Sequence, residues 1–132
     1  MAITVSTTKI AQYPEKTVKR AARAFSCSPF KLKLFVAMQN QSIPLPTIAN
    51  NRGIENNYTP KAIAESKAES HLVWLINVGL LRREVDGQGI TDSFRLTPLG
   101  RQIIAQWEAQ GEMPQPSLSD RILNWLSRWL RY

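Results

Sequence analysis

The fold is decided by residues 72–100, which are LVWLINVGLLRREVDGQGITDSFRLTPLG. The leucines of the first part recur at the spacing of one helix face, and Gly79 suits the end of a helix. Residues 80–85 and 93–97 then follow the pattern of β-strands, on either side of residues that tolerate turns. The sequence therefore predicts a helix that leads directly into a β-hairpin.

The predicted helix begins at Thr59-Pro60, because Pro at a first helical position loses no hydrogen bond, and no Gly or Pro interrupts it before Gly79. Its apolar stripe faces the core and contains Ala68, Leu72, Leu75 and Ile76. The far side is free to contact a partner and contains Ser66, Lys67, Ser70, Trp74 and Asn77. Trp74 on that side needs a cover, and we expect the basic N-terminal helix, rather than a partner, to provide it.

Shorter helices are predicted upstream of this unit. Ser28-Pro29 is a helix opening, and the apolar residues 30–38 predict a buried helix that ends near Asn40. Pro46 then starts a short helix that stops at Gly53.

Two helices are predicted downstream. Thr97-Pro98 opens a helix that ends at Gly111 and faces Leu99, Ile103, Ile104 and Trp107 inward. After a linker at residues 112–116, residues 117–131 form an amphipathic helix. Its apolar stripe contains Leu118, Ile122, Trp125, Leu126, Trp129 and Leu130, with Arg121, Arg128 and Arg131 opposite.

Basic residues gather near the N-terminus. Residues 1–26 carry Lys9, Lys16, Lys19, Arg20 and Arg23 against Glu15 alone. We expect residues 1–13 to be a mobile arm and residues from Pro14 onward to form a helix that faces Val18, Ala21, Ala22 and Phe25 inward. The basic face of this helix is either solvated or in contact with phosphates.

Length and composition narrow the function. A chain of 132 residues has room for one domain, and its net charge of +7 attracts polyanions, of which nucleic acid is the commonest and an anionic membrane surface the next. One Cys and one His cannot form a structural zinc site, so we expect no metal and no other cofactor. With no bilayer-spanning run and no secretory signal, we expect a cytoplasmic protein.

The predicted order is helix, helix, long helix, hairpin, helix. Its specific residues are Leu72, Leu75 and Gly79-Leu80-Leu81 before the turn, then Phe94-Arg95-Leu96-Thr97 and Gly100 after it. Roughly residues 28–110 thereby resemble the winged helix-turn-helix domain of MarR/PadR-type transcriptional regulators. The resemblance implies a mainly α fold with a small β-hairpin. Together with the charge and periodicity of the flanking residues, it predicts a basic N-terminal arm and helix (1–27), a winged-helix domain (28–111) and a linker with an amphipathic C-terminal helix (112–132).

The resemblance also implies a regulator of transcription that binds double-stranded DNA as a homodimer. The helix at 60–78 would lie in the major groove, with Ser66, Lys67 and Ser70 as contacts to bases or phosphates. The hairpin would be the wing and would carry Arg82, Arg83 and Arg95 to the DNA backbone or minor groove. The N-terminal segment would add phosphate contacts through Lys16, Lys19, Arg20 and Arg23.

An alternative function follows from two features of the sequence. Residues 81–100 carry three basic and three acidic side chains, and residues 55–60 add a stretch before the long helix that typical family members lack. Both favour a winged-helix adaptor that binds a protein partner in a larger complex, for which a membrane face is one setting.

The C-terminal helix has three interpretations. It packs on its own domain, pairs with a second subunit, or lies on a membrane surface with its arginines toward the head groups. We favour the homodimer and expect an interface built from Trp74, Ile122, Trp125, Leu126 and Trp129.

Catalysis is not expected. His71 lies mid-helix beside the apolar stripe and is expected to pack there, and Cys27 is expected to be an inert thiol. The sequence offers no paired carboxylates and no nucleophile with an adjacent base, so we expect a protein that is not an enzyme.

Overall fold

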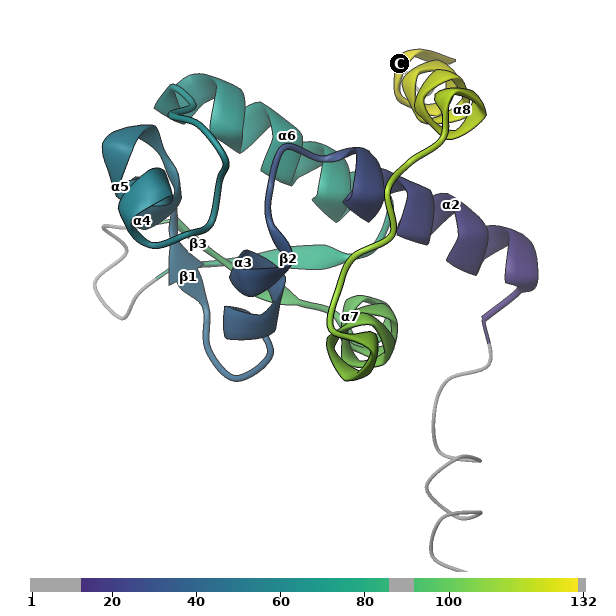
Figure 1. The fold of residues 1–132 in the computed structure, drawn as a ribbon, viewed down its shortest axis with the longest axis horizontal. Helices are drawn as coiled ribbons and strands as arrows, with labels where there is room; N and C mark the ends of the chain where they lie inside the picture. The colour runs from purple at the N-terminus through teal and green to yellow at the C-terminus, as the bar shows by residue number, and fades with distance from the viewer. Residues whose placement is uncertain (1–12, 86–91, 131–132) are drawn as a thin grey trace, which may run out of the picture.

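The computed structural model describes residues 13–85 and 92–130, which form a mainly helical fold with a small three-stranded antiparallel sheet (Figure 1). This coarse fold class was predicted from the sequence. The elements, in chain order, are α2 (Glu15–Cys27), α3 (Leu32–Ala37), β1 (Ile43–Pro44), α4 (Leu45–Ile48), α5 (Asn50–Glu55), α6 (Glu65–Asn77), β2 (Leu81–Val85), β3 (Asp92–Leu96), α7 (Pro98–Gln110) and α8 (Leu118–Leu130). The predicted arm up to residue 12, the turn at 86–91 and Arg131 lie outside the described residues.

The sheet has the strand order β1-β3-β2. The predicted hairpin is confirmed, with Leu81 opposite Leu96 and Val85 opposite Asp92. The short strand β1, in which Ile43 pairs with Phe94, was not predicted, because Pro44 indicated only an interruption between helices. Proline is tolerated there because β1 lies at the edge of the sheet.

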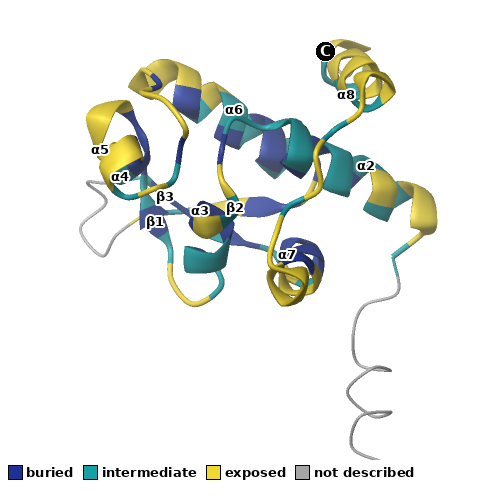
Figure 2. Cartoon of the chain, viewed as in Figure 1, coloured by how far each residue is buried: buried dark blue, intermediate teal, exposed yellow. Residues whose placement is uncertain are grey.

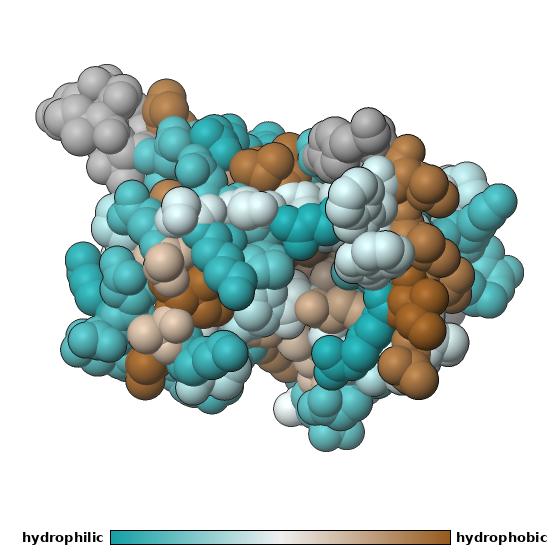
Figure 3. All heavy atoms as spheres, turned by 90° about the horizontal axis from the view of Figure 1, so that it is seen from above, coloured by the Kyte–Doolittle hydropathy of each residue, from teal (hydrophilic) through white to brown (hydrophobic). Residues whose placement is uncertain are grey.

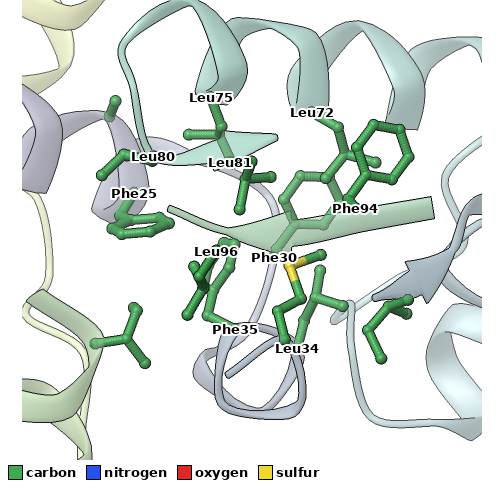
Figure 4. Close-up of a cluster of buried hydrophobic side chains, with 14 of the residues drawn as sticks. Phe25, Phe30, Leu34, Phe35, Leu72, Leu75, Leu80, Leu81, Phe94 and Leu96 are labelled. Carbon is green, nitrogen blue, oxygen red and sulfur yellow. The ribbon is translucent and has the colours of Figure 1, made fainter. Parts of the chain in front are cut away.

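The core lies on both faces of this sheet (Figure 4). Helix α6 covers one face and contributes Leu72 and Leu75, while α3 lies on the other side with Leu34 and Phe35 (Figures 1 and 4). Helix α2 enters the same core through Phe25, whose ring lies 4.5 Å from that of Phe35 and 5.9 Å from that of Trp107. The basic N-terminal helix is therefore part of the central packing.

Two predicted helix starts are wrong. Ser28 ends α2, because its backbone N–H and its hydroxyl both donate to the Phe25 carbonyl, so α3 begins only at Leu32. Helix α6 begins at Glu65 and not at Pro60. Residues 60–64 stay outside the helix, and the buried Ile63 accepts a hydrogen bond through its carbonyl from the Asn50 N–H at 2.7 Å.

The predicted end of a helix at Gly53 is also wrong. The chain forms two short helices, α4 and α5, separated at Ala49, and Gly53 lies inside the second. A Cβ atom at Gly53 would overlap the Ile48 carbonyl oxygen. Glycine is therefore required here by the close approach of two backbones, and Asn57, with φ 63°, makes the turn after α5.

The helix after the hairpin was predicted correctly. Thr97 caps α7 by accepting a hydrogen bond from the Gly100 N–H at 3.2 Å, and Gly111 ends the helix with φ 87°. The inward residues are buried as expected, namely Leu99, Ile103, Ile104 and Trp107. Short-range signals therefore determined both ends of α7.

Candidate interaction surface at helices α6 and α8

Helix α6 presents the polar face that the sequence predicted. Ala68, Leu72 and Leu75 are buried and Ile76 is half-buried, so the opposite side points away from the core. Ser66 and Lys67 are exposed in the first turn of the helix. These two side chains are available to a partner.

Ser70 is hydrogen-bonded to helix α8. The Arg128 guanidinium donates to the Ser70 hydroxyl at 3.0 Å and to the Ser70 carbonyl at 3.3 Å. It also lies 3.3 Å from Nδ1 of His71. Because a guanidinium only donates, the His71 Nδ1 accepts this bond, and the neutral ring carries its proton on Nε2. Helix α8 therefore lies against the outward side of α6.

Trp74 is covered within the chain, as expected, and helix α8, which was not predicted to do so, takes part in the cover. Its exposed fraction is 4%, and its indole N–H donates to the side-chain oxygen of Asn124 on α8 at 3.1 Å. In the described chain, Trp74 is thus buried beneath α8 rather than presented to a partner. The other predicted interface residues, Ile122, Trp125, Leu126 and Trp129, are exposed.

A groove of about 720 Å³ runs between α6 and α8. Trp125 and Trp129, whose rings lie 6.0 Å apart, belong to the α8 wall. The complete lining is Ser66, Glu69, Ser70, Val73, Trp74, Trp125, Arg128 and Trp129. Apolar walls with a few polar groups and a volume of this order are typical of binding sites.

The three arginines of the hairpin are all ion-paired. Arg82 lies 2.9 Å from Glu84, and Arg95 lies 4.0 Å from the same carboxylate. Arg83 lies 3.2 Å from Asp92 and 3.5 Å from Glu69 of α6. The acidic partners offset the positive charge that a DNA-binding wing would present to phosphates.

The predicted basic residues of α2 differ in exposure. Lys16 and Lys19 are exposed, with Lys19 3.0 Å from the Glu15 carboxylate, whereas Arg20 and Arg23 are half-buried. Burial of the arginine stems is consistent with the packing of α2 against α8. A phosphate-contacting role for this helix would rest on Lys16 and Lys19.

A smaller cavity of about 210 Å³ lies beneath α8 and is lined by both Cys27 and His71. Burial raises the pKa of the Cys27 thiol, so the reactive thiolate is disfavoured at neutral pH. Burial, with Arg128 and Lys67 nearby, lowers the pKa of His71. Within the described residues, no three His, Cys, Asp or Glu side chains gather as metal ligands.

Comparison with known proteins places the chain in a family. A family model described as Npun_F0494-like matches residues 11–128, which include every helix and strand from α2 to α7 and nearly all of α8. The chain belongs to the Npun_F0494-like family. No curated protein and no solved structure matches it.

The α6–α8 groove of this Npun_F0494-like protein was not predicted from its sequence. From the sequence, the apolar stripe of α8 was expected against the domain, a second subunit or a membrane, and an inward polar side was not predicted. A signal was available, because Asn124 and Arg128 are four residues apart and share one side of the helix. Glu69, the carboxylate of the groove, was not singled out as a candidate residue.

Proposed function

We propose that this Npun_F0494-like chain is a non-enzymatic interaction protein with a winged-helix fold, which binds a protein partner in the α6–α8 groove. The observation that carries the proposal is the contact of Arg128 with Ser70. It holds α8 over the side of α6 that a winged-helix regulator would insert into the major groove.

The winged-helix part of the proposal is supported by topology. Helix α3, strand β1, helices α4 to α6 and the hairpin follow one another in the order expected for that fold. The hairpin strand β3 lies between β1 and β2, so the short early strand pairs with the wing. Sequence resemblance and sheet order thus support the same architecture.

The chemistry of the groove favours a protein segment. The indole rings of Trp125 and Trp129 and the side chain of Val73 offer apolar contacts, and tryptophan is enriched at the positions that dominate protein interfaces. Ser66 and Glu69 supply polar groups at the same site. An apolar helix or extended segment with a hydrogen-bond donor matches this lining.

Site-specific photocrosslinking in the cells that make the protein tests this proposal. A photoreactive residue at Ser66, in the groove, should give a discrete adduct with one protein, and Trp129→Ala should weaken that adduct. The same residue at Glu108, exposed on α7 and outside the groove lining, is the matched control and should give none. Equal adducts at both positions, or none at Ser66, would contradict the proposal.

A second candidate function is a winged-helix transcription regulator that binds duplex DNA as a homodimer. It is favoured by the net charge of +7 and by the exposure of Ser66 and Lys67 at the start of α6. Binding of the whole α6 face in a major groove requires α8 to leave Ser70.

Fluorescence anisotropy with labelled duplexes tests the second candidate. A regulator should bind one sequence better than others, and its affinity should fall steeply as salt rises. In Lys67→Ala, the slope of log affinity against log salt concentration should become shallower by about one unit. Light scattering should show a dimer. A crosslinked adduct that is specific to the groove, without duplex binding, supports the interaction protein. Sequence-specific duplex binding without such an adduct supports the regulator.

A further inference from the structure

Helix α8 packs with its polar side inward. The half-buried residues of this helix are all polar, namely Asp120, Asn124, Ser127 and Arg128. Its large apolar side chains are all exposed, with exposed fractions of 81% for Leu130, 74% for Leu118 and 65% for Trp129. An amphipathic helix on a water-soluble body normally packs the other way.

The apolar residues that lie outside the groove lining form a continuous strip, which we call the outer face of α8. It consists of Leu118, Ile122, Leu123, Leu126 and Leu130, with Trp125 and Trp129 along its edge. Figure 3 shows the hydrophobic residues as a band over α8, toward the right of the view, and Figure 2 shows no buried residue in that helix. A patch of this kind indicates a surface that another body covers.

Charge distinguishes a second copy of the chain from a membrane as the partner that covers the outer face. Helix α2, which packs against α8, carries exposed Lys16 and Lys19, and Arg121 on α8 and Lys67 on α6 are also exposed. A second copy of the chain would bring a net charge of +7 against another +7. An anionic bilayer brings charge of the opposite sign.

We propose that the outer face of α8 binds in the plane of an anionic lipid membrane. Its leucines and isoleucine would enter the region between head groups and acyl chains, where tryptophan side chains such as Trp125 and Trp129 are favoured. The exposed cations of α2, α6 and α8 would contact lipid phosphates. The attachment is peripheral, since no helix within residues 13–85 and 92–130 is long and apolar enough to cross a bilayer.

The membrane surface and the groove share Trp125 and Trp129 at their border but otherwise use different residues. Ile122 and Leu126 do not line the groove, and Ser66 and Val73 are not part of the outer face. The inference therefore goes beyond the proposed function and does not depend on what the groove binds. The two can fail separately.

Co-sedimentation of the full chain with vesicles tests the inference. The chain should bind phosphatidylcholine vesicles that contain about one-third phosphatidylglycerol, and binding should weaken with salt and with pure phosphatidylcholine. The double variant Ile122→Gln/Leu126→Gln should bind about tenfold more weakly, because apolar insertion is lost. Its control is Ile54→Gln/Val85→Gln, which alters two apolar side chains that are 45% and 61% exposed away from α8 and should leave binding unchanged.

Circular dichroism should show that both double variants are folded, because all four substituted side chains are solvent-exposed. Three results would overturn the inference. The first is no binding to either vesicle. The second is anionic binding that Ile122→Gln/Leu126→Gln leaves intact, which would reflect charge alone. The third is a dimer by light scattering that the same variant dissociates without any vesicle binding, which would assign the outer face to a second copy.

Discussion

The indole N–H of Trp74 on α6 donates to the side-chain oxygen of Asn124 on α8 at 3.1 Å, although the two residues are 50 positions apart in the sequence. Trp74 is almost fully buried, and this bond gives its indole N–H a partner within the chain. It joins the last helix of the chain to the helix that would read DNA in a winged-helix regulator. The pair therefore contributes, with Arg128 and the packing on α2, to the position of α8.

Replacing Asn124 should loosen α8. Asn124→Ala leaves the buried Trp74 N–H without its partner, at a cost of about 1 to 3 kcal/mol. Cys27, the only cysteine of the chain, lines the cavity beneath α8, so its rate of modification by a thiol reagent should rise by roughly tenfold. Leu123→Ala, on the exposed side of α8, is the control, and an equal rise in both variants would contradict the prediction.

Gly53→Ala should destabilise the whole fold. The added methyl group would overlap the Ile48 carbonyl and lie 2.7 Å from the Thr59 hydroxyl, so backbone must move, at a cost of at least about 2 kcal/mol. Gly111→Ala is the comparison, because nothing lies within 4 Å there and only its positive φ costs about 1 kcal/mol. Urea denaturation of both variants measures the difference, and a smaller loss at Gly53 would disprove the close-contact explanation.

Acid should weaken the fold through His71. Its pKa in the folded protein is lowered below 6.5 by burial and by Arg128 and Lys67. The unfolded chain therefore takes up a proton first, and the free energy of unfolding should fall as pH drops below about 6.5, until the lower pKa of the folded state is passed. In His71→Gln, the free energy of unfolding should depend less on pH between about pH 7.5 and 5.5. Since His71 is the only histidine, its NMR titration gives the pKa directly, and a value above 6.5 would reverse the predicted sign.

Removing the acidic partners of the hairpin should increase binding to nucleic acid. Glu69→Gln/Glu84→Gln leaves Arg82, Arg83 and Arg95 with fewer ion pairs and adds two units of positive charge. Non-specific affinity for duplex DNA should rise, and the salt slope should steepen by about one for each arginine that gains a phosphate. Fluorescence anisotropy at two salt concentrations measures both. Glu108→Gln/Glu112→Gln adds the same charge on exposed positions elsewhere, and an equal effect there would show that only net charge matters.

Phe25→Ala should unfold more than the N-terminal helix. The Phe25 ring is fully buried against Phe35 and Trp107, so its loss should cost about 3 to 5 kcal/mol in global stability. Lys16→Ala on the exposed side of α2 should cost almost nothing. Hydrogen exchange measures the stability of each helix separately. If α3 and α7 are as stable in Phe25→Ala as in the unchanged chain, α2 is not part of the core and the prediction is wrong.

Elements whose signals are local could be predicted from the sequence. The hairpin and α7 follow from residues within a few positions of each boundary, such as the Thr97 cap and the left-handed Gly111. The buried stripe of α6 was also correct at Ala68, Leu72 and Leu75. Hydrophobic period and capping chemistry carry this information without any knowledge of distant contacts.

Elements that depend on distant contacts could not be predicted. The start of α6 is delayed by the bond between Asn50 and Ile63, and β1 exists only because β3 pairs with it. The orientation of α8 depends on the contacts of Asn124 and Arg128 with α6, which lies 50 and 58 residues earlier at the bonded positions. Periodicity showed that α8 has two faces, but only the tertiary contacts determine which face turns inward.

Because the polar side of α8 faces inward, the packing of α8 on α6 and the binding of another molecule over α8 are thermodynamically linked. The bonds from Trp74 to Asn124 and from Arg128 to Ser70 lie beneath the helix, at the border with solvent. A membrane or partner that covers the leucines and also the edges of α8 excludes water from that border and strengthens those bonds, because electrostatic attraction grows as the local dielectric falls. By thermodynamic reciprocity, a chain whose α8 packs more firmly on α6 binds the covering membrane or partner more tightly.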